Sequence, residues 1–192
     1  MSAIAGASPD RGGPGVRRGG GVTLSGPIIG SGPIAGPGTI AGIARHASPR
    51  APMEELERTL ITPEQGVEGD CKGAFKVGKR NRRQVTLIER ADWDAAMAEL
   101  GAGHRWSARR ANLLVDGLDL PQREGAVLRI GAVRLEVTVE CDPCQRMDEI
   151  EPGLQAMLRA DWRGGVCTRV LAGGEIAVGD MIEIELETEI AA

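Results

Sequence analysis

The stretch Val133-Arg134-Leu135-Glu136-Val137-Thr138-Val139, followed closely by Cys141-Asp142-Pro143-Cys144, carries the most information about the fold. Apolar and polar residues alternate in its first part, as they do in a half-buried strand. The cysteine pair then lies where this strand ends and the chain turns, at the rim of a rigid element, where binding and catalytic residues are often placed. We therefore predict a strand with one apolar face, made of Val133, Leu135, Val137 and Val139.

Similar short apolar runs recur on both sides of this stretch. They predict further strands at residues 39–45, 85–88, 111–115, 126–130, 166–171 and 182–186. Turns are expected at Asp116-Gly117, at Ile130-Gly131-Ala132 and at Gly173-Gly174. Because the strands are short, closely spaced and more numerous than the helices, the pattern predicts a mainly β protein, a β-barrel with a few short helices, rather than a parallel βαβ sheet.

Two helices are predicted, at residues 91–100 and 152–158. The first places apolar side chains on one face, with Asp92 as its expected N-cap and Gly101 as its end. Residues 53–60 also contain helix-forming residues, but the segment from Glu57 to Thr62 fits an extended chain equally well. The sequence therefore does not decide between a helix and a strand in that segment.

The 192 residues suffice for one domain with a substantial core. Aromatic residues make up only 2% of the chain, so this core has to be built from Val, Ile, Leu and Ala. Residues 1–38 are rich in Gly and Pro and gain too little from burial to offset the backbone entropy of folding, which predicts disorder. We expect the domain to span residues 39–187 and a short tail to follow at 188–192.

The net charge of −4 is unevenly distributed, since residues 1–40 carry three Arg against one Asp, whereas residues 41–192 carry 20 basic and 26 acidic groups, or −6. A domain this acidic is a poor nucleic-acid binder, although its local basic clusters suit a small anionic ligand.

No apolar run approaches the roughly 18 residues of a membrane-spanning helix, and the N-terminus lacks the pattern of a signal peptide. We therefore expect a cytoplasmic protein without a membrane partner, whose cysteines are thiols or ligands rather than disulfides.

The pair Cys141 and Cys144 allows four interpretations. A zinc site would need two more ligands at matching spacing, but the other two cysteines stand alone and the two histidines lie far apart in the sequence. A thioredoxin-like redox pair would need a βαβ context, and the two thiols could also be rim residues without a role. The residues favour a single working thiolate at Cys144, because Pro143 fixes the turn before it and Arg146 offers nearby positive charge.

Basic residues gather at three places that could bind an anion. Gly66–Asp70 is followed by six cations up to Arg83, and most of these fit a solvated loop, but Arg83 directly precedes an apolar strand. Arg109-Arg110-Ala111-Asn112 leads into another predicted strand. Arg can bind phosphate or carboxylate through two hydrogen bonds, and Asn can both donate and accept. Arg169, within the predicted strand at 166–171, is a further candidate anion contact.

In their order and spacing, these segments resemble the MOSC domain, the family named after the C-terminal domain of molybdenum-cofactor sulfurase. The resemblance covers roughly residues 39–187 and implies a closed β-barrel of the kind first described in a pyruvate kinase domain. The matching stretches are residues 66–70, Arg83-Gln84-Val85-Thr86-Leu87-Ile88, 109–118, 137–147 and 164–180, the last ending in Gly-Gly-Glu-Ile-x-Val-Gly-Asp.

The resemblance also implies that the protein binds the molybdenum cofactor, a pterin with a phosphate and a dithiolene, and that a Cys thiolate ligates the molybdenum. By position this catalytic and metal-binding role falls on Cys144, while Cys141 becomes a neighbouring or sulfur-relay thiol. A soft thiolate suits a metal that is already held by sulfur. The expected cofactor contacts are Asp70, Arg83, Arg109, Arg110, Asn112 and Arg169.

Family members of this type reduce N-hydroxylated small molecules such as hydroxylamino-purines and amidoximes. The resemblance thus implies a molybdenum-dependent oxidoreductase that takes electrons from a separate donor protein. One alternative is a sulfur or molybdenum-cofactor carrier that acts through a Cys persulfide without reductase turnover, and another is a zinc-binding or interaction module without catalysis. The chain departs from the family pattern at two places: Cys71-Lys72 lacks the His often found there, and Cys167 stands where relatives often carry an aromatic residue.

Overall fold

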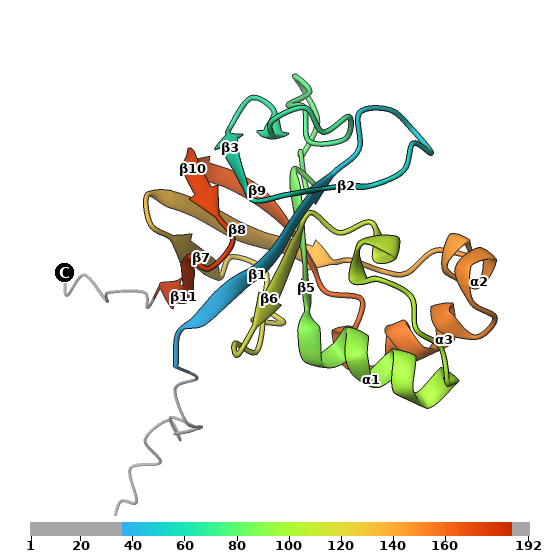
Figure 1. The fold of residues 1–192 in the computed structure, drawn as a ribbon. Helices are drawn as coiled ribbons and strands as arrows, with labels where there is room; N and C mark the ends of the chain where they lie inside the picture. Colours follow the sequence, from blue (N-terminus) through green and yellow to red (C-terminus); the bar gives the residue numbers. More distant parts are fainter. Residues whose placement is uncertain (1–35, 186–192) are drawn as a thin grey trace, which may run out of the picture. The chain divides into compact units, whose positions relative to one another are not determined.

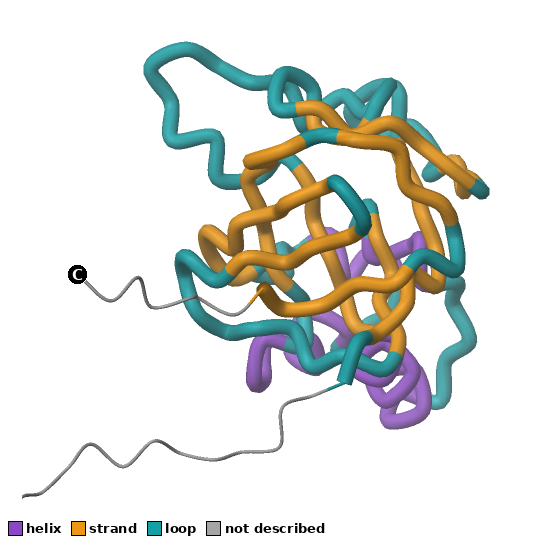
Figure 2. Tube along the Cα trace, turned by 90° about the vertical axis from the view of Figure 1, so that its left-hand side faces the viewer, coloured by secondary structure: helices purple, strands orange, loops and turns teal. Residues whose placement is uncertain are grey.

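A closed barrel of seven strands dominates the computed structural model, which describes residues 36–185 (Figure 1, Figure 2). The barrel strands are β1 (Gly38–Arg45), β5 (Val85–Glu89), β6 (Leu113–Asp116), β7 (Val127–Ile130), β8 (Val133–Glu140), β9 (Val166–Ala172) and β11 (Met181–Glu185). Their order around the barrel is β11–β7–β8–β9–β5–β6–β1, and β1 pairs with β11 to close the ring. The sequence-based prediction of a mainly β, barrel-forming chain is confirmed.

One pair of barrel strands is parallel, and this pair explains the position of the longest helix in the described chain. β5 and β6 run in the same direction, whereas the other neighbouring barrel strands are antiparallel. Parallel neighbours need a crossover connection, which here consists of α1 (Arg90–Leu100) and the 3-10 turn η1 (Trp106–Arg109). This connection delivers Arg109 and Arg110 to the start of β6.

A small three-stranded sheet of order β10–β3–β4 is separate from the barrel sheet. It contains β3 (Arg58–Thr62), β4 (Gly66–Val67) and β10 (Gly174–Ala177), while β2 (Glu54–Leu56) pairs with β1. The segment left open at residues 53–62 is therefore extended. The turn expected at Gly173-Gly174 is wrong at its second residue, because Gly174 already pairs with Ile61 in this sheet.

β8 departs from strict alternation close to the cysteines. Its register against β9 shifts between Val137 and Val139. The expected inward residues up to Val137 are buried, but Thr138 is buried as well and Val139 is only half-buried. The Thr138 hydroxyl lies within hydrogen-bonding distance of the carbonyl oxygens of Arg82 and Cys167. The predicted place of Val139 on the apolar face is wrong, because the strict alternation ends at this irregularity and Val139 is not part of the barrel core.

Two apolar cores stabilise the fold. Side chains from all seven strands fill the barrel, and they are almost entirely Val, Ile and Leu, as the composition predicts. The second core lies outside the barrel wall, where α1, α2 (Arg146–Ile150) and α3 (Leu154–Arg159) pack on β5 and β6. Figure 2 shows these helices gathered on one side of the barrel. The second core includes Ile88, Trp93, Met97, Leu114, Met147, Leu154 and Leu158.

The helix predicted at 91–100 is α1, and Gly101 ends it in the left-handed conformation, with φ of 63°. The predicted cap was wrong. The N-cap is Glu89, and its carboxylate accepts a hydrogen bond from the Leu120 amide (2.7 Å) rather than capping the helix. The second predicted helix is α3, which is followed by the 3-10 turn η2 (Ala160–Trp162). The five-residue α2 was not predicted, because so short a helix shows no apolar period.

The two ends of the chain lie largely outside the part that the structure describes. β1 begins at Gly38, one residue before the predicted domain boundary. Most of the segment predicted to be disordered, residues 1–38, falls outside the described range, and so does the tail at 188–192. Within residues 36–185, no helix has the length and apolar character needed to cross a membrane.

Gly165 allows β9 to begin against β5, and its replacement tests how tightly the barrel closes there. Its φ is +86°, and a Cβ would lie 1.9 Å from the carbonyl oxygen of Leu87. We expect Gly165→Ala to lower the free energy of unfolding by about 3 kcal/mol or more, measured by urea denaturation. Gly125→Ala is the matched control, because Gly125 has a φ of +88° with nothing within 4 Å. Its loss should stay near 1–2 kcal/mol, roughly the cost of the left-handed conformation alone. Equal losses in the two variants would contradict the close contact.

Candidate functional site

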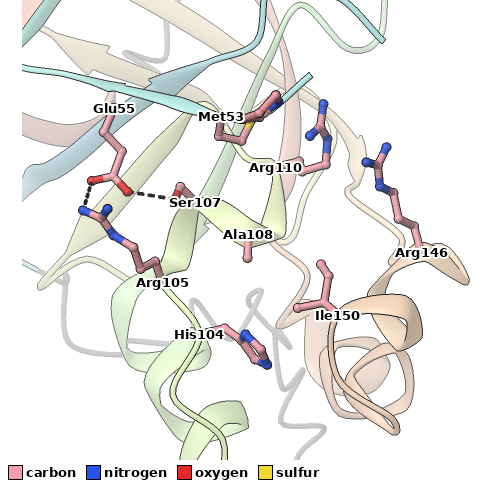
Figure 3. Close-up of a pocket in the computed structure, with 10 residues that line it drawn as sticks. Met53, Glu55, His104, Arg105, Ser107, Ala108, Arg110, Arg146 and Ile150 are labelled. Atoms are coloured by element: carbon pink, nitrogen blue, oxygen red, sulfur yellow. Dashed lines mark hydrogen bonds and ion pairs between the residues drawn. The ribbon is translucent and has the colours of Figure 1, made fainter. Parts of the chain in front are cut away.

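A pocket of about 510 Å³ opens beside the start of α2. Its walls come from the segment around β2, from the loop that leads into η1, from η1 itself and from α2. Figure 3 shows Arg110 and Arg146 on one side and Glu55 on the other. Three arginines face one carboxylate, so the pocket favours an anionic ligand. The lining residues are Pro52, Met53, Glu55, His104, Arg105, Ser107, Ala108, Arg110, Arg146 and Ile150.

Arg110 has unused hydrogen-bonding capacity in this pocket. Its Nη1 donates to the carbonyl oxygen of Ala51 (2.7 Å), but its Nε and Nη2 are buried without a partner among the described residues. Burial lowers the pKa of Arg110, and the nearby charge of Arg146 lowers it further. An anion bound here would satisfy two donors and reduce the repulsion between the two guanidinium groups.

The opposite wall is polar but paired within itself. Glu55 accepts hydrogen bonds from Arg105 Nη2 (3.1 Å) and Ser107 Oγ (2.8 Å), which Figure 3 marks. His104 Nε2 lies 3.0 Å from a carboxylate oxygen of Glu151. The free donors of the pocket are therefore concentrated at its Arg110 end.

Arg109 precedes Arg110 in the chain but faces the cysteine loop instead of the pocket. Its Nη2 donates to the carbonyl oxygens of Cys141 (2.6 Å) and Gly164 (2.7 Å) and lies 3.2 Å from Cys141 Sγ. A Cβ on Gly164 would lie 2.6 Å from that Cys141 oxygen, so the close approach requires glycine. Within residues 36–185 no carboxylate forms an ion pair with Arg109. The ionisable group that contacts this buried cation is the Cys141 thiol.

Cys141 and Cys167 form a polarised thiol pair in the barrel wall, where both are buried. A hydrogen bond from Cys167, together with the charges of Arg109 and Arg83, lowers the pKa of Cys141 to about 5 against the opposing effect of burial. The hydrogen bond to Cys141, burial and the Cys141 charge raise the pKa of Cys167. Of the two, Cys141 is therefore the thiol that ionises more readily, and Cys167 is its hydrogen-bond donor.

Cys144 is exposed on the loop between β8 and α2. This loop is held on both sides of the thiol. The Gln155 side chain donates to the carbonyl oxygen of Pro143 (2.9 Å), and the Met147 amide donates to that of Cys144 (2.9 Å). The two cysteines of the motif are unequal, as the sequence suggested. Positive charge from Arg109 and Arg83 acts on the other cysteine of the motif, Cys141.

Two of the expected cofactor contacts, Asp70 and Asn112, are buried and bonded to each other. Asn112 Nδ2 donates to Asp70 Oδ2 (3.1 Å) and to the Ala44 carbonyl (3.2 Å). Asn112 Oδ1 accepts from the amide (3.1 Å) and hydroxyl (3.0 Å) of Thr86, and Asp70 Oδ1 accepts from the Lys72 amide (2.8 Å). The two side chains thus connect β1, β5, β6 and the loop after β4, and protein groups occupy their hydrogen-bonding atoms.

His46, which looks isolated in the sequence, lies beside Asp70 and Cys71. Its Nδ1 is 2.9 Å from Asp70 Oδ2, and one potential ligand atom from each of the three residues lies within 4.8 Å of the others. Burial lowers the pKa of His46. The charges of Arg110 and Lys72 lower it further, whereas Asp70 raises it. The neutral ring donates its Nδ1 proton to Asp70, which leaves Nε2 as a buried acceptor without a partner in the described chain.

The position of His46 also bears on one departure from the family pattern, the His that is missing near Cys71-Lys72. Family members often have a His near the place of Cys71-Lys72, and in this chain the residue after β1, His46, lies there. The two segments are 24 residues apart, so no local pattern reveals the pairing. The one available signal was a His directly after a predicted strand.

Lys72 and Arg83 extend the positive charge from the pocket toward the thiols. Burial lowers the pKa of Lys72, and the charges of Arg83 and Arg110 lower it further. Arg83 also helps to lower the pKa of Cys141. Cations from three separate segments therefore lie around one region that contains the sulfur atoms of Cys71, Cys141 and Cys167.

Arg169 is the expected contact that the structure does not bring to this region. It lies opposite Glu136 on β8, and its Nε donates to the Glu136 carboxylate (2.8 Å). That pair lines a different surface hollow. Arg109 belongs to the region around the pocket and the thiols only through its contacts with the cysteine loop. The predicted residues that the structure gathers around the pocket and the thiols are Asp70, Arg83, Arg109, Arg110, Asn112 and Cys144.

The ionised Cys141 should make stability depend on pH. Its folded pKa of about 5 lies below the ~8.5 of an unperturbed thiol, so between these values the unfolded chain binds up to one more proton than the folded chain. The stabilisation from the thiolate is then full above ~8.5 and is lost as the pH falls through the folded value. Urea unfolding under reducing conditions should show that the stability gap between the native protein and Cys141→Ala widens as the pH rises from about 5 to 8.

The exposed thiol provides the control for this titration. Cys144→Ala, which removes an exposed thiol, should change the free energy of unfolding only slightly. A stability gap for Cys141→Ala that stays the same across the pH range would contradict the assignment of Cys141 as the thiolate.

Comparison with known proteins places this site in a family. The MOSC domain model matches residues 74–183. The structure is similar to that of the YuaD protein from Bacillus subtilis, with a TM-score of 0.66 at 19% identity over 77% of this chain and 95% of that chain. It is also similar to YiiM from Escherichia coli (TM-score 0.58, 17% identity, 77% and 70% covered) and to YiiM from Geobacillus stearothermophilus (TM-score 0.60, 15% identity, 78% and 76% covered). No curated protein matches the chain. These low identities support the shared fold alone, but the family match spans more than half of the sequence, and the protein therefore belongs to the MOSC domain family, which is associated with the molybdenum cofactor.

Proposed function

We propose that this protein binds the molybdenum cofactor and reduces N-hydroxylated small molecules, with the Cys144 thiolate as a ligand of the molybdenum. One observation carries the proposal: Arg110, which lines a pocket of about 510 Å³ together with Arg146, has two buried nitrogen atoms without a partner among the described residues. A buried hydrogen-bond donor without an acceptor destabilises the folded protein unless a ligand supplies the acceptor. A phosphate, with several acceptor oxygens and a negative charge, is such a ligand.

The surrounding charges support the same assignment. In this proposal Arg110 and Arg146 hold the phosphate of the cofactor, and Lys72 and Arg83 balance its remaining negative charge. Burial lowers the pKa values of Lys72 and Arg110, and the charges of neighbouring cations lower them further. An anion bound beside these cations would reduce that repulsion. Asp70 contributes indirectly, since it fixes the loop that carries Lys72 through the bond to the Lys72 amide.

The cysteine loop supports Cys144 as the ligand. Cys141 is held in the wall by Arg109, whereas Cys144 is exposed on a loop that is fixed at both sides. A soft thiolate suits molybdenum. When bound, the cofactor supplies a metal centre that passes two electrons to the substrate. Arg109 and Cys141 then position the loop, and Cys144 is the thiol that remains free to reach the metal.

The rest of the pocket suits a small, partly polar substrate. Met53 and Ile150 provide apolar surface, and Ser107 and Glu55 provide polar atoms. In the proposed reaction a hydroxylamine nitrogen–oxygen bond breaks, two electrons and two protons are taken up, and an amine and a water molecule are formed. The protein's own residues bind and orient the reactants in this scheme.

The first test is metal content. Protein made in a host that produces the cofactor should contain molybdenum, and Cys144→Ser should lose most of it because the thiolate ligand is gone. Elemental analysis and the reduction of 6-hydroxylaminopurine by reduced methyl viologen provide the two measurements. Cys167→Ser, a change at a buried thiol outside the pocket, should retain molybdenum. Native protein that carries no molybdenum from such a host would refute the proposal.

The second test separates two arginines. Arg110→Met should lower cofactor retention at least tenfold, because one charged, multidentate contact of this kind is worth roughly 1.5–3 kcal/mol. Arg169→Met should leave retention unchanged, since Arg169 pairs with Glu136 away from the pocket. The pterin content of the purified variants, measured by fluorescence after oxidation, gives the comparison. Equal losses in the two variants would show that the Arg110 end of the pocket has no special role.

A second candidate function has one observation in its favour. The exposed Cys144 lies three residues from the buried thiolate Cys141, an arrangement that suits a carrier of sulfane sulfur. Such a carrier would form a persulfide on Cys144 when incubated with a sulfur donor. Mass spectrometry would detect the added sulfur and its removal by a reductant, whereas unmodified thiols would exclude this function.

A further inference from the structure

The loop between β4 and β5 is strongly basic in an otherwise acidic domain. Its segment from Lys72 to Arg83 contains six cations and no acidic residue, while residues 41–192 as a whole carry a net charge of −6. Figure 1 shows this loop at the end of β5 opposite to α1. A concentration of one sign of charge on a domain of the opposite sign creates a local field that attracts an oppositely charged partner.

The loop has a defined shape. The Asn81 side chain accepts a hydrogen bond from the Lys76 amide (2.8 Å) and donates to the carbonyl oxygens of Lys76 (3.0 Å) and Lys79 (2.9 Å). The Phe75 amide donates to the Glu64 carbonyl (2.7 Å). These bonds hold the backbone of the loop in one arrangement, so a partner does not have to order the loop when it binds.

The outward side chains of the loop combine charge with apolar surface. In the described part of the chain, Lys76, Lys79 and Arg80 form no ion pair. Phe75 is 54% exposed and Val77 is 90% exposed. Unpaired cations beside an exposed aromatic side chain are typical of a protein-binding surface, where charge guides the encounter and apolar contact slows dissociation.

Both ends of the loop lie at the candidate site. At its start, Lys72 follows Cys71 and lies near Arg110, and at its end Arg83 lies near Cys141. A protein seated on the loop would therefore lie next to the region proposed to hold the cofactor. That position suits a partner that exchanges electrons with the site.

We infer that the outer part of this loop, Phe75 to Arg80, is the docking surface for an acidic electron-donor protein. This inference rests on the proposed function, which consumes two electrons in each turnover and needs a separate donor that is oxidised by the same number. The negative charge of the surrounding domain disfavours a long nucleic acid, which would extend beyond the loop. A small acidic redox protein can contact the loop without approaching the acidic surface.

The test compares two donors and two matched triple variants. Lys76→Gln/Lys79→Gln/Arg80→Gln removes three positive charges from the loop. The control, Arg58→Gln/Arg129→Gln/Arg134→Gln, removes three from exposed sites whose ion pairs to Glu175, Glu183 and Glu185 are worth little. The reduction of 6-hydroxylaminopurine is measured with reduced flavodoxin, a small acidic protein, and with reduced methyl viologen, a small molecule that needs no docking surface.

With flavodoxin at low ionic strength, the loop variant should react about tenfold more slowly than the native protein, and salt should narrow the difference. With methyl viologen it should equal the native protein, and the control variant should be normal with both donors. An unchanged flavodoxin rate in the loop variant would overturn the inference, as would native protein that turns over with methyl viologen but not with flavodoxin.

A binding measurement separates this inference from the proposed function. Oxidised flavodoxin is titrated into each protein at low salt by calorimetry, which requires no turnover. The native and control proteins should bind it, and the loop variant should bind about tenfold more weakly. Failure of turnover with methyl viologen would refute the proposed function alone. Absence of flavodoxin binding, or tight binding of a single-stranded RNA that the loop variant loses, would overturn the docking surface.

Discussion

The contact between the buried guanidinium of Arg109 and Cys141 is the constraint on which the candidate site depends. A buried cation must be balanced, and removing one partner of such a pair typically costs about 3–5 kcal/mol. One nitrogen of Arg109 reaches the Cys141 carbonyl, the Cys141 sulfur and the Gly164 carbonyl. The contact therefore joins η1, the end of β8 and the start of β9 at a single point.

Two consequences follow for the neighbouring residues. Arg109 lies in the wall, whereas Arg110, whose backbone is left-handed with φ of 64°, lines the pocket. With Cys141 held as the balancing thiolate, Cys144 remains exposed three residues later. The two consecutive arginines thus have different roles, and so do the two cysteines of the motif. In each pair, one member fixes the local structure and the other does not.

The sequence predicted the barrel well because its signals were local. Alternation in β8, short apolar runs at β5 and β9, and Gly101 at the end of α1 each depend on neighbours within a few residues. The errors at Val139 and Asp92 were also local in position, but their causes were not. At the register shift, the Thr138 side chain bonds to a carbonyl group of β9. At α1, a contact 31 residues away engages Glu89, the residue that takes the N-cap position in place of Asp92.

The candidate site was predicted less completely, since its chemistry depends on pairs that are distant in the sequence. The position of Cys144 on the loop and of Arg110 beside the pocket followed from motifs. The thiolate character of Cys141 depends on Cys167, and His46 gains its role only beside Asp70. Arg169 shows the converse, because a plausible anion contact is neutralised by its cross-strand neighbour Glu136. The resemblance to a family could name these residues but could not show which partners they meet.

We propose above that the pocket holds a molybdenum cofactor whose metal is ligated by Cys144. X-ray absorption at the molybdenum edge is the sharpest test of this ligation, because it counts the sulfur atoms bound to the metal. Native protein should have one sulfur neighbour more than Cys144→Ser reconstituted with the same cofactor, and Cys141→Ser should keep the native number. An identical sulfur count in native protein and Cys144→Ser, or the loss of a sulfur in Cys141→Ser instead, would contradict it.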